Sequence, residues 1–209
     1  MIFNKKDKIF CIGFNKTGTT SLNQVLKEFN YKLGSQAKSE YLIQDYLKRD
    51  WKSILKFCKT AEAFQDVPFS LPYTWLIIQK YFPDAKYILT FRDEELWYKS
   101  ITNFHTNKFS NNDMPPTYDE LKNADYRFKG YMLSYMEAIN NNNKKVPYDK
   151  DTLISCYRRH NEDVKFFFRK NKNFLMLDLS ASDAYLKLCD FLNKKPIHTQ
   201  FPHYKKTKI

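Results

Sequence analysis

A chain of 209 residues with 43% hydrophobic and 17% aromatic residues has the composition of a globular protein, which excludes an intrinsically disordered chain. The formal net charge of +12 suits a nucleic-acid-binding protein or a protein with a polyanionic cofactor or substrate, but the lysines are spread along the whole chain and no recognition-helix or stacking-sheet motif is visible. No apolar run approaches the ~20 residues that span a bilayer, and the N-terminus lacks signal-peptide features, so we expect a cytoplasmic protein.

Short apolar runs alternate with longer amphipathic stretches, which predicts an α/β fold with a mainly parallel central sheet flanked by helices. Strands are expected over about 8–14, 61–65, 86–91 and 173–177. Helices are expected over about 18–29, 39–58 (one or two helices), 71–82, 94–107, 117–139, 150–170 and 181–193, with loops over 108–117 and 140–149. No domain boundary is visible, so residues 1–209 are predicted to form a single domain.

Residues 13–22, Gly-Phe-Asn-Lys-Thr-Gly-Thr-Thr-Ser-Leu, join the first predicted strand to the first predicted helix. Two of the four glycines of the chain, Gly13 and Gly18, frame this loop, which indicates a demand on backbone geometry. In a strand–loop–helix of this kind, backbone N–H groups and the positive end of the helix dipole point into the turn, and Lys16 adds a full charge. The loop therefore predicts a phosphate or sulfate site; the alternative is an ordinary turn with solvated Lys and Thr side chains.

The spacing of this loop nearly matches the nucleotide-binding motif G-x-x-x-x-G-K-S/T. Where that motif has lysine, this chain has Thr19, and its own lysine lies earlier, at Lys16. The shift removes the lysine position that binds Mg·ATP but leaves an anion-binding loop with three successive hydroxyls, those of Thr19, Thr20 and Ser21.

A P-loop kinase remains an alternative, because the strand over 173–177 ends at Asp178, which could hold Mg²⁺. A non-catalytic basic binding protein is a second alternative.

Polar groups follow the carboxyl ends of three predicted strands: the Lys16 loop, Asp66 and Arg92. In parallel α/β sheets, ligands bind at this edge, so we expect the three groups to converge on one site.

Together these features resemble the sulfotransferases that use 3′-phosphoadenosine 5′-phosphosulfate (PAPS). That family opens with a strand–loop–helix similar to Lys16-Thr17-Gly18-Thr19-Thr20-Ser21-Leu22, which holds the 5′-phosphosulfate. Its second signature is a strand that ends in arginine, with a serine eight positions later, both binding the 3′-phosphate; Arg92 and Ser100 have this spacing. The resemblance implies a P-loop NTPase-like sulfotransferase fold. It also implies that the residues binding PAPS are Lys16, Thr17, Gly18, Thr19, Thr20, Ser21, Arg92 and Ser100.

The resemblance also implies a general base, which is a histidine in many sulfotransferases and a carboxylate in others. Asp66, in Phe64-Gln65-Asp66-Val67-Pro68, has the matching place. An ordinary aspartate is a weak base unless burial raises its pKa, an effect that Lys16 nearby would oppose. As alternatives, Asp66 only caps the turn before Pro68, or His105 or His160 is the base.

The implied reaction is in-line transfer of the sulfuryl group from PAPS to a hydroxyl or amine, with Lys16 and the loop amides stabilising the leaving group and no metal required. The acceptor class stays open among carbohydrates, lipids, phenols and peptides. Five aromatic residues are candidates either for an acceptor pocket or for the core: Phe69, Tyr73, Trp75, Phe104 and Phe109.

Three further features of the sequence lead to expectations. Residues 157–160 and the basic segment 201–207 are similar to sulfotransferase segments, and the basic segment could reach the 3′-phosphate. The four cysteines, at positions 11, 58, 156 and 189, form no Cys-x-x-Cys or His-Cys cluster. We therefore expect reduced, mostly buried cysteines and no metal site.

Overall fold

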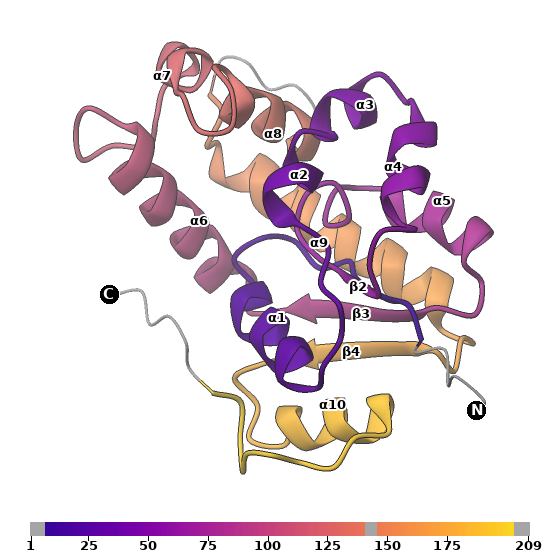
Figure 1. The fold of residues 1–209 in the computed structure, drawn as a ribbon. Helices are drawn as coiled ribbons and strands as arrows, with labels where there is room; N and C mark the ends of the chain where they lie inside the picture. Colours follow the sequence, from indigo (N-terminus) through magenta and orange to yellow (C-terminus); the bar gives the residue numbers. More distant parts are fainter. Residues whose placement is uncertain (1–6, 141–145, 203–209) are drawn as a thin grey trace.

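A computed structural model describes residues 7–140 and 146–202 (Figure 1). Within these ranges lie four strands, β1 (Ile9–Cys11), β2 (Ala63–Phe64), β3 (Lys86–Phe91) and β4 (Phe174–Asp178). The helices of the same ranges are α1 (Thr19–Glu28), α2 (Gln36–Glu40), α3 (Ile43–Leu47), α4 (Trp51–Phe57), α5 (Thr74–Tyr81), α6 (Glu94–Phe109), α7 (Tyr118–Asn123), α8 (Tyr131–Ile139), α9 (Lys150–Phe168) and α10 (Ala184–Leu192).

The strands form one all-parallel sheet in the order β2-β1-β3-β4. Ile9 of β1 pairs with Ala63 on one side and with Lys86 on the other. Because the strands are parallel, their carboxyl ends share one edge, and the segments that follow β1, β2 and β3 begin side by side. The predicted α/β fold with a parallel central sheet flanked by helices is confirmed.

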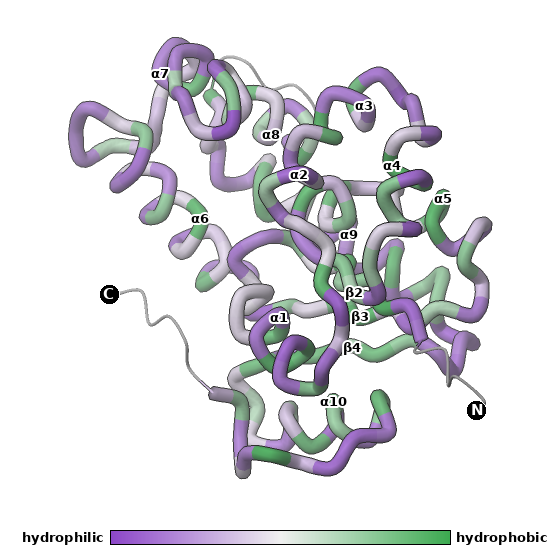
Figure 2. The backbone as a smooth tube through the Cα atoms, in the orientation of Figure 1, coloured by the Kyte–Doolittle hydropathy of each residue, from purple (hydrophilic) through white to green (hydrophobic). Residues whose placement is uncertain are grey.

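Alternate residues of β1 face opposite helical layers, as the period of a strand requires. Ile9 and Cys11 pack in a hydrophobic cluster with residues of α1 and α10. Phe10 and Ile12 pack on the other face with residues of α5 and α9. Figure 1 shows α10 on one side of β3 and β4 and α9 on the other. The strands are coloured mainly as hydrophobic in Figure 2, as expected for a sheet covered on both faces.

A third hydrophobic cluster lies at the carboxyl edge of the sheet and consists mainly of residues from α3, α6, α7, α8 and α9. Phe14, from the loop after β1, belongs to this cluster, as do Val67 and Leu71, from the segment after β2. The helical layer therefore packs directly on the two segments that the sequence assigns to the site.

The boundaries of several elements differ from the prediction. The stretch expected as one or two helices over 39–58 contains three helices, α2, α3 and α4. Helix α2 begins before the predicted stretch. Arg49 and Asp50, the N-cap of α4, lie between α3 and α4. The helix expected over 117–139 is wrong as a single element: it is α7 and α8, interrupted at residues 124–130 by a bridge between Asp125 and Lys129 and by Gly130 in a left-handed conformation (φ 82°). The strands β1 and β2 are shorter than expected, because the chain turns soon after Cys11 and Phe64.

All four cysteines are free, and Cys11, Cys58 and Cys189 are buried, as predicted. Across residues 7–140 and 146–202, no helix combines the length and apolar character needed to cross a membrane.

Candidate active site

A cavity of about 930 Å³ lies at the carboxyl edge of the sheet. Its wall brings together eight of the residues predicted for the site: Lys16, Gly18, Thr19, Thr20, Ser21, Asp66, Arg92 and Ser100. The three polar segments that follow β1, β2 and β3 thus converge on one cavity, as expected from their places at the strand ends.

The anion loop, residues 13–18, depends on close backbone packing. A Cβ atom on Gly13 would lie 2.2 Å from the Thr90 carbonyl oxygen, and one on Gly18 would lie 2.7 Å from Cδ2 of Leu179. Gly18 also has a φ of 95°, which disfavours any other residue. Gly18 caps α1, and no side chain of the described residues caps this helix, so its N-terminal N–H groups lie at the cavity wall beside Thr19 and Thr20.

Buried hydrogen bonds brace the anion loop from behind. The hydroxyl of Thr17, which is 3% exposed, donates to the Phe14 carbonyl oxygen at 2.6 Å. Its single proton is used there, so the Thr90 hydroxyl is the donor in the 2.6 Å hydrogen bond between the two threonines. Trp97 Nε1 donates to the Asn15 carbonyl oxygen at 3.0 Å. The Thr17 side chain is absent from the cavity wall, so its predicted contact with PAPS would have to come from its backbone N–H.

Lys16 and Arg92 place two cations on this side of the cavity. Lys16 has a φ of 71°, and its Nζ lies 4.0 Å from the centroid of the Phe104 ring. Arg92 Nη1 donates to the Lys16 carbonyl oxygen at 3.4 Å, which links the end of β3 directly to the loop. Asp93 caps α6 by accepting a hydrogen bond from the backbone N–H of Leu96.

The end of β3 is held by Tyr157 of α9. The Tyr157 hydroxyl accepts a hydrogen bond from the backbone N–H of Arg92 and donates one to its carbonyl oxygen, each at 3.0 Å. The Tyr157 ring stacks on Trp97, with 4.3 Å between ring centroids and 10° between ring planes. The segment 157–160 thus contributes a support for the Arg92 backbone.

Asp66 lies directly after β2 in a left-handed conformation (φ 56°) and is 5% exposed. Burial raises the pKa of Asp66 to about 6; a hydrogen bond from Thr19 and the charge of Lys16 oppose this rise, and the charge of Glu40 adds to it. The Asp66 Oδ1 atom has no hydrogen-bond partner among the described residues. A carboxylate with this pKa is ionised at neutral pH and is a better proton acceptor than an ordinary aspartate.

The two histidines named as alternative bases lie in different places. His105 is buried in the cavity wall, its Nδ1 is 2.8 Å from the Tyr148 hydroxyl, and burial with the charges of Lys16 and Lys108 lowers its pKa to about 3. A histidine with this pKa is neutral and weakly basic at pH 7.

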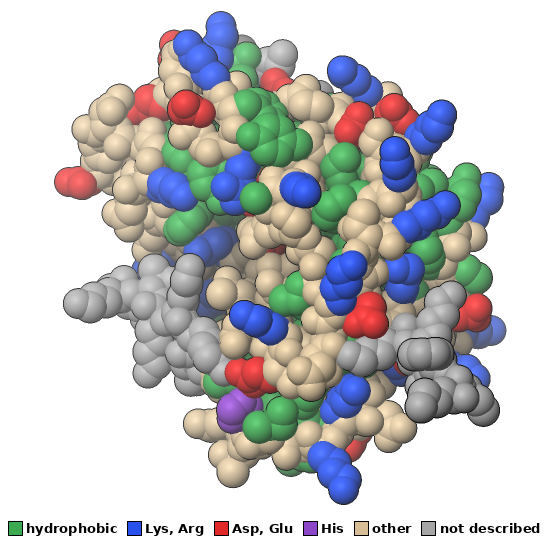
Figure 3. Space-filling model, in the orientation of Figure 1, with side chains coloured by type: hydrophobic (Ala, Val, Ile, Leu, Met, Phe, Trp, Pro, Cys, Tyr) green, Lys and Arg blue, Asp and Glu red, His purple; other side chains and the backbone are tan. Residues whose placement is uncertain are grey.

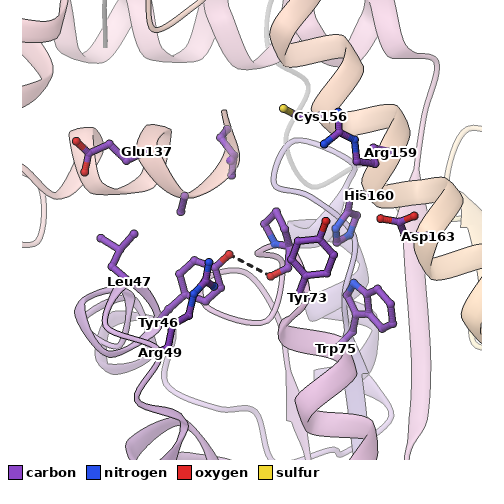
Figure 4. A pocket seen from close by; sticks show the side chains of 13 residues that line it. Tyr46, Leu47, Arg49, Tyr73, Trp75, Glu137, Cys156, Arg159, His160 and Asp163 are labelled. Atoms are coloured by element: carbon purple, nitrogen blue, oxygen red, sulfur yellow. Dashed lines mark hydrogen bonds between the residues drawn. The ribbon is translucent and has the colours of Figure 1, made fainter. Parts of the chain in front are cut away.

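His160 is absent from the wall of this cavity, so the structure does not bring this alternative base to the site. Its Nε2 donates to the Ile12 carbonyl oxygen at 2.8 Å, and burial lowers its pKa to about 4. It lines a second, smaller cavity of about 210 Å³, together with Tyr73 and Trp75 (Figure 4).

Of the five aromatic residues considered for an acceptor pocket, Phe104 and Phe109 line the large cavity. The other three do not: Phe69 is fully buried in the core, while Tyr73 and Trp75 line the smaller cavity.

Sequence reasoning missed the residues on the far side of the cavity. They come from α2, from the residue before Asp66, from the break between α7 and α8, and from α8 itself: Gln36, Glu40, Gln65, Tyr126, Arg127, Tyr131, Met132 and Tyr135. Glu40 is buried and forms an ion pair with Arg127, 87 positions along the chain. Gly130 is the sequence signal that could have revealed the break carrying Tyr126 and Arg127.

Asp178, which supported the kinase alternative, ends β4, which is separated from β1 by β3. Its carboxylate accepts hydrogen bonds from the backbone N–H and the hydroxyl of Ser180, at 2.9 and 2.7 Å, and it is absent from the wall of the large cavity. The aspartate that would hold Mg²⁺ in a kinase, Asp178, therefore lies outside the large cavity.

Basic side chains are scattered over the face shown in Figure 3, with acidic side chains among them, which is unlike the continuous basic stripe of a nucleic-acid-binding surface. Of the basic C-terminal segment, Phe201 is buried beside Tyr185. The remaining part of that prediction, residues 203–207, lies outside the described residues.

A sulfotransferase domain matches residues 8–209, nearly the whole chain. No curated protein matches the chain. Because this match covers nearly the whole chain, the chain belongs to the sulfotransferase family.

Proposed function

We propose that this protein is a PAPS-dependent sulfotransferase that transfers the sulfuryl group to an acceptor hydroxyl or amine by in-line displacement, and that the chain acts as one domain. The observation that carries the proposal is the convergence of the Lys16 loop, Arg92 with Ser100, and Asp66 on one cavity. The Lys16 loop and Arg92 with Ser100 are two separate elements suited to anions, which matches a donor with a phosphosulfate at one end and a 3′-phosphate at the other. The Asp66 carboxylate suits an acceptor that must lose a proton.

The donor fits the residues of the β1 and β3 side. The loop N–H groups, the N-terminus of α1 and Lys16 would hold the phosphosulfate, because Gly18 and the first residues of α1 line the cavity and no side chain of the described residues caps this helix. Arg92, with Ser100 on the next helix, would bind the 3′-phosphate, since a guanidinium can form two parallel hydrogen bonds to a phosphate.

When bound, PAPS supplies the sulfuryl group: the acceptor atom forms a bond to sulfur while the bond from sulfur to the bridging oxygen breaks, and adenosine 3′,5′-bisphosphate leaves. Lys16 and the loop amides stabilise the negative charge that develops on that oxygen. Asp66 takes the acceptor's proton on its carboxylate. We assign this role to Asp66 rather than to His105, because a pKa of about 6 gives a stronger base than a pKa of about 3.

The test is calorimetric titration of the protein with adenosine 3′,5′-bisphosphate without metal, and with Mg·ATP in parallel. We expect the bisphosphate to bind without metal and the Arg92→Ala variant to bind it about 10- to 100-fold more weakly, which is the loss typical of a hydrogen bond to a charged group. Arg158→Ala is the matched control, because Arg158 is an exposed arginine nearby that forms an ion pair with Glu94.

Preference for Mg·ATP over the bisphosphate, or equal binding by wild type and Arg92→Ala, would contradict the proposal. Turnover is then measured as release of the bisphosphate from PAPS in the presence of candidate acceptors.

A further inference from the structure

Three buried polar atoms in the wall of the large cavity have no hydrogen-bond partner among the described residues: Gln65 Oε1, Asp66 Oδ1 and Tyr135 Oη. Their residues are only 8%, 5% and 3% exposed. Buried polar groups in native proteins are nearly always paired, so three such atoms in one cavity indicate a ligand that pairs with them.

Adjacency in the chain and one electrostatic effect link these three groups, and we call the part of the cavity wall that carries them the corner. Gln65 and Asp66 are neighbours after β2, and the Asp66 charge, together with burial, raises the pKa of Tyr135, which places Asp66 near α8. In the sheet, β2 and β3 flank β1 on opposite sides, so this corner lies across the anion loop from Arg92. It is therefore on the acceptor side of the site, beside the proposed base.

The chemistry of this corner selects among acceptors. The Gln65 and Asp66 oxygens accept hydrogen bonds, whereas the Tyr135 hydroxyl can donate or accept. A phenol or a simple alcohol has one hydroxyl, which would pair with Asp66 and leave the other two groups unpaired. An ammonium group would face two lysines of the same cavity wall, Lys16 and Lys108, while Glu40 of this wall already pairs with Arg127. Neighbouring hydroxyls on one ring can donate to both oxygens and accept from the tyrosine.

We propose that the acceptor is a sugar or similar polyol, in which the hydroxyl to be sulfated lies at Asp66 and its neighbouring hydroxyls pair with Gln65 and Tyr135. This inference rests on the proposed function for the identity of the reacting hydroxyl. The binding of a polyhydroxylated ring by the three residues is testable without turnover.

The first experiment is calorimetric titration with methyl β-D-glucopyranoside, methyl β-D-galactopyranoside and cellobiose, with and without adenosine 3′,5′-bisphosphate, against 4-methylphenol and 1-hexanol. We expect at least one of the sugars to bind more tightly than the phenol and the alcohol. For the sugar that binds, its monodeoxy analogues are titrated next. Loss of a hydroxyl that pairs with Gln65 or Tyr135 is expected to weaken binding about tenfold or more.

Two variants identify the partners of those hydroxyls. Gln65→Met and Tyr135→Phe each remove one unpaired polar atom while keeping the shape of the side chain. In each variant, we expect the difference between the sugar and one of its deoxy analogues to shrink to less than about twofold, because the missing hydroxyl no longer has a partner. The matched control is Tyr46→Phe, which removes a hydroxyl bonded to the Pro72 carbonyl oxygen in the smaller cavity and should keep the full difference.

The outcomes separate this inference from the proposed function. Binding of the phenol or alcohol in preference to every sugar, or no binding of any sugar, overturns the inference even if the bisphosphate binds. A deoxy penalty that persists in both variants overturns the assignment to Gln65 and Tyr135. Sugar binding that depends on Tyr135 supports the inference even if the bisphosphate does not bind, and in that case only the proposed function fails.

Discussion

The two sides of the large cavity differ in how their polar groups are paired. On the β1 and β3 side, Thr17, Asn15 and the Arg92 backbone all form hydrogen bonds to buried partners, so the loop has its geometry before any ligand binds. On the β2 side, Asp66 and Tyr135 each hold a buried polar atom without a partner among the described residues. The comparison supports the proposal of a preformed donor site beside an acceptor site that is completed by its ligand.

The largest expected effect is on the acceptor side. Asp66→Asn removes the proton acceptor, so kcat/KM for sulfation should fall about 100-fold or more. In the wild type, kcat/KM should rise with pH through about 6 and then level off, because the base acts in its deprotonated form and burial raises its pKa to about 6. The measurement is the pH profile of steady-state sulfation. Asp178→Asn is the control and should retain the profile, since Asp178 bonds Ser180 outside the cavity.

The same variant tests whether Asp66 destabilises the fold when ionised. The folded-state pKa, about 6, lies above the ordinary value near 4, so the folded protein holds this proton more tightly than the unfolded chain. Stability should therefore fall as the pH rises from about 4 to about 6 and stay lower above that range, by about 3 kcal/mol. Asp66→Asn should be more stable than the wild type in denaturant unfolding at about pH 8 and nearly equal to it at about pH 4. Lower stability at both pH values would show that the carboxylate is fully paired, and the contrast between the two sides would disappear.

On the donor side, Lys16→Ala should lower kcat about 100-fold, since a cation aimed at developing charge acts mainly in the transition state. Rates of bisphosphate release from PAPS measure the effect. Lys27→Ala, at an exposed lysine of α1, is the comparison variant and should retain the wild-type rate. Equal rates in Lys16→Ala and Lys27→Ala would exclude Lys16 from the chemistry.

A smaller effect, on affinity for the bisphosphate, is expected when the Tyr157 hydroxyl that holds the Arg92 backbone is removed. Tyr157→Phe leaves the backbone N–H and carbonyl oxygen of Arg92 without their hydroxyl partner. The affinity for the bisphosphate should fall about tenfold in calorimetry, because the Arg92 position becomes less well defined. Tyr185→Phe is closely matched: the Tyr185 hydroxyl also bonds two backbone groups, accepting from the N–H groups of Ile197 and His198, but Tyr185 is absent from the cavity wall. Similar losses in the two variants would mean that Tyr157 acts on overall stability alone.

The smallest expected effect concerns the connection between the two sides. The hydroxyl of buried Ser70, four positions after Asp66, donates to Asn15 Oδ1 of the anion loop at 2.8 Å. Ser70→Ala should lower the free energy of unfolding by about 1 kcal/mol, measured by denaturant titration. Ser39→Ala, which removes a local hydrogen bond to the Gln36 carbonyl oxygen, is the control for loss of a buried serine hydroxyl. A Ser70→Ala variant as stable as the wild type would show that the two sides are not joined through this contact.

The residues that the sequence assigns to the donor side are close together in the chain, and the structure brings all of them except Thr17 to one cavity wall. The loop over 13–22 is recognised from a strand, two glycines and the start of a helix. Arg92 follows the end of a predicted strand, and Ser100 lies eight positions later in the next predicted helix. Their convergence with Asp66 follows from the parallel sheet alone.

Apart from Asp66, the residues of the other side are not predicted from the sequence, since they are joined only by tertiary packing. Glu40 pairs with Arg127 across 87 positions, and nothing local in either segment specifies that contact. Arg127 also lies where a continuous helix was expected over 117–139, because the apolar spacing of α7 carries on into α8. The turn that separates them is formed by a bridge between Asp125 and Lys129, a feature that helical periodicity does not detect.

The contact between Lys16 and Phe104 has a consequence for affinity. A lysine side chain free in solvent samples many rotamers, and ordering it on binding opposes association by about 0.5–1.5 kcal/mol. With its Nζ 4.0 Å from the Phe104 ring centroid, the Lys16 side chain packs on that ring in the folded protein, and this contact restricts its rotamers. Most of the rotamer entropy of Lys16 is therefore lost on folding. Binding of an anion at the loop then orders this side chain at little further entropic cost.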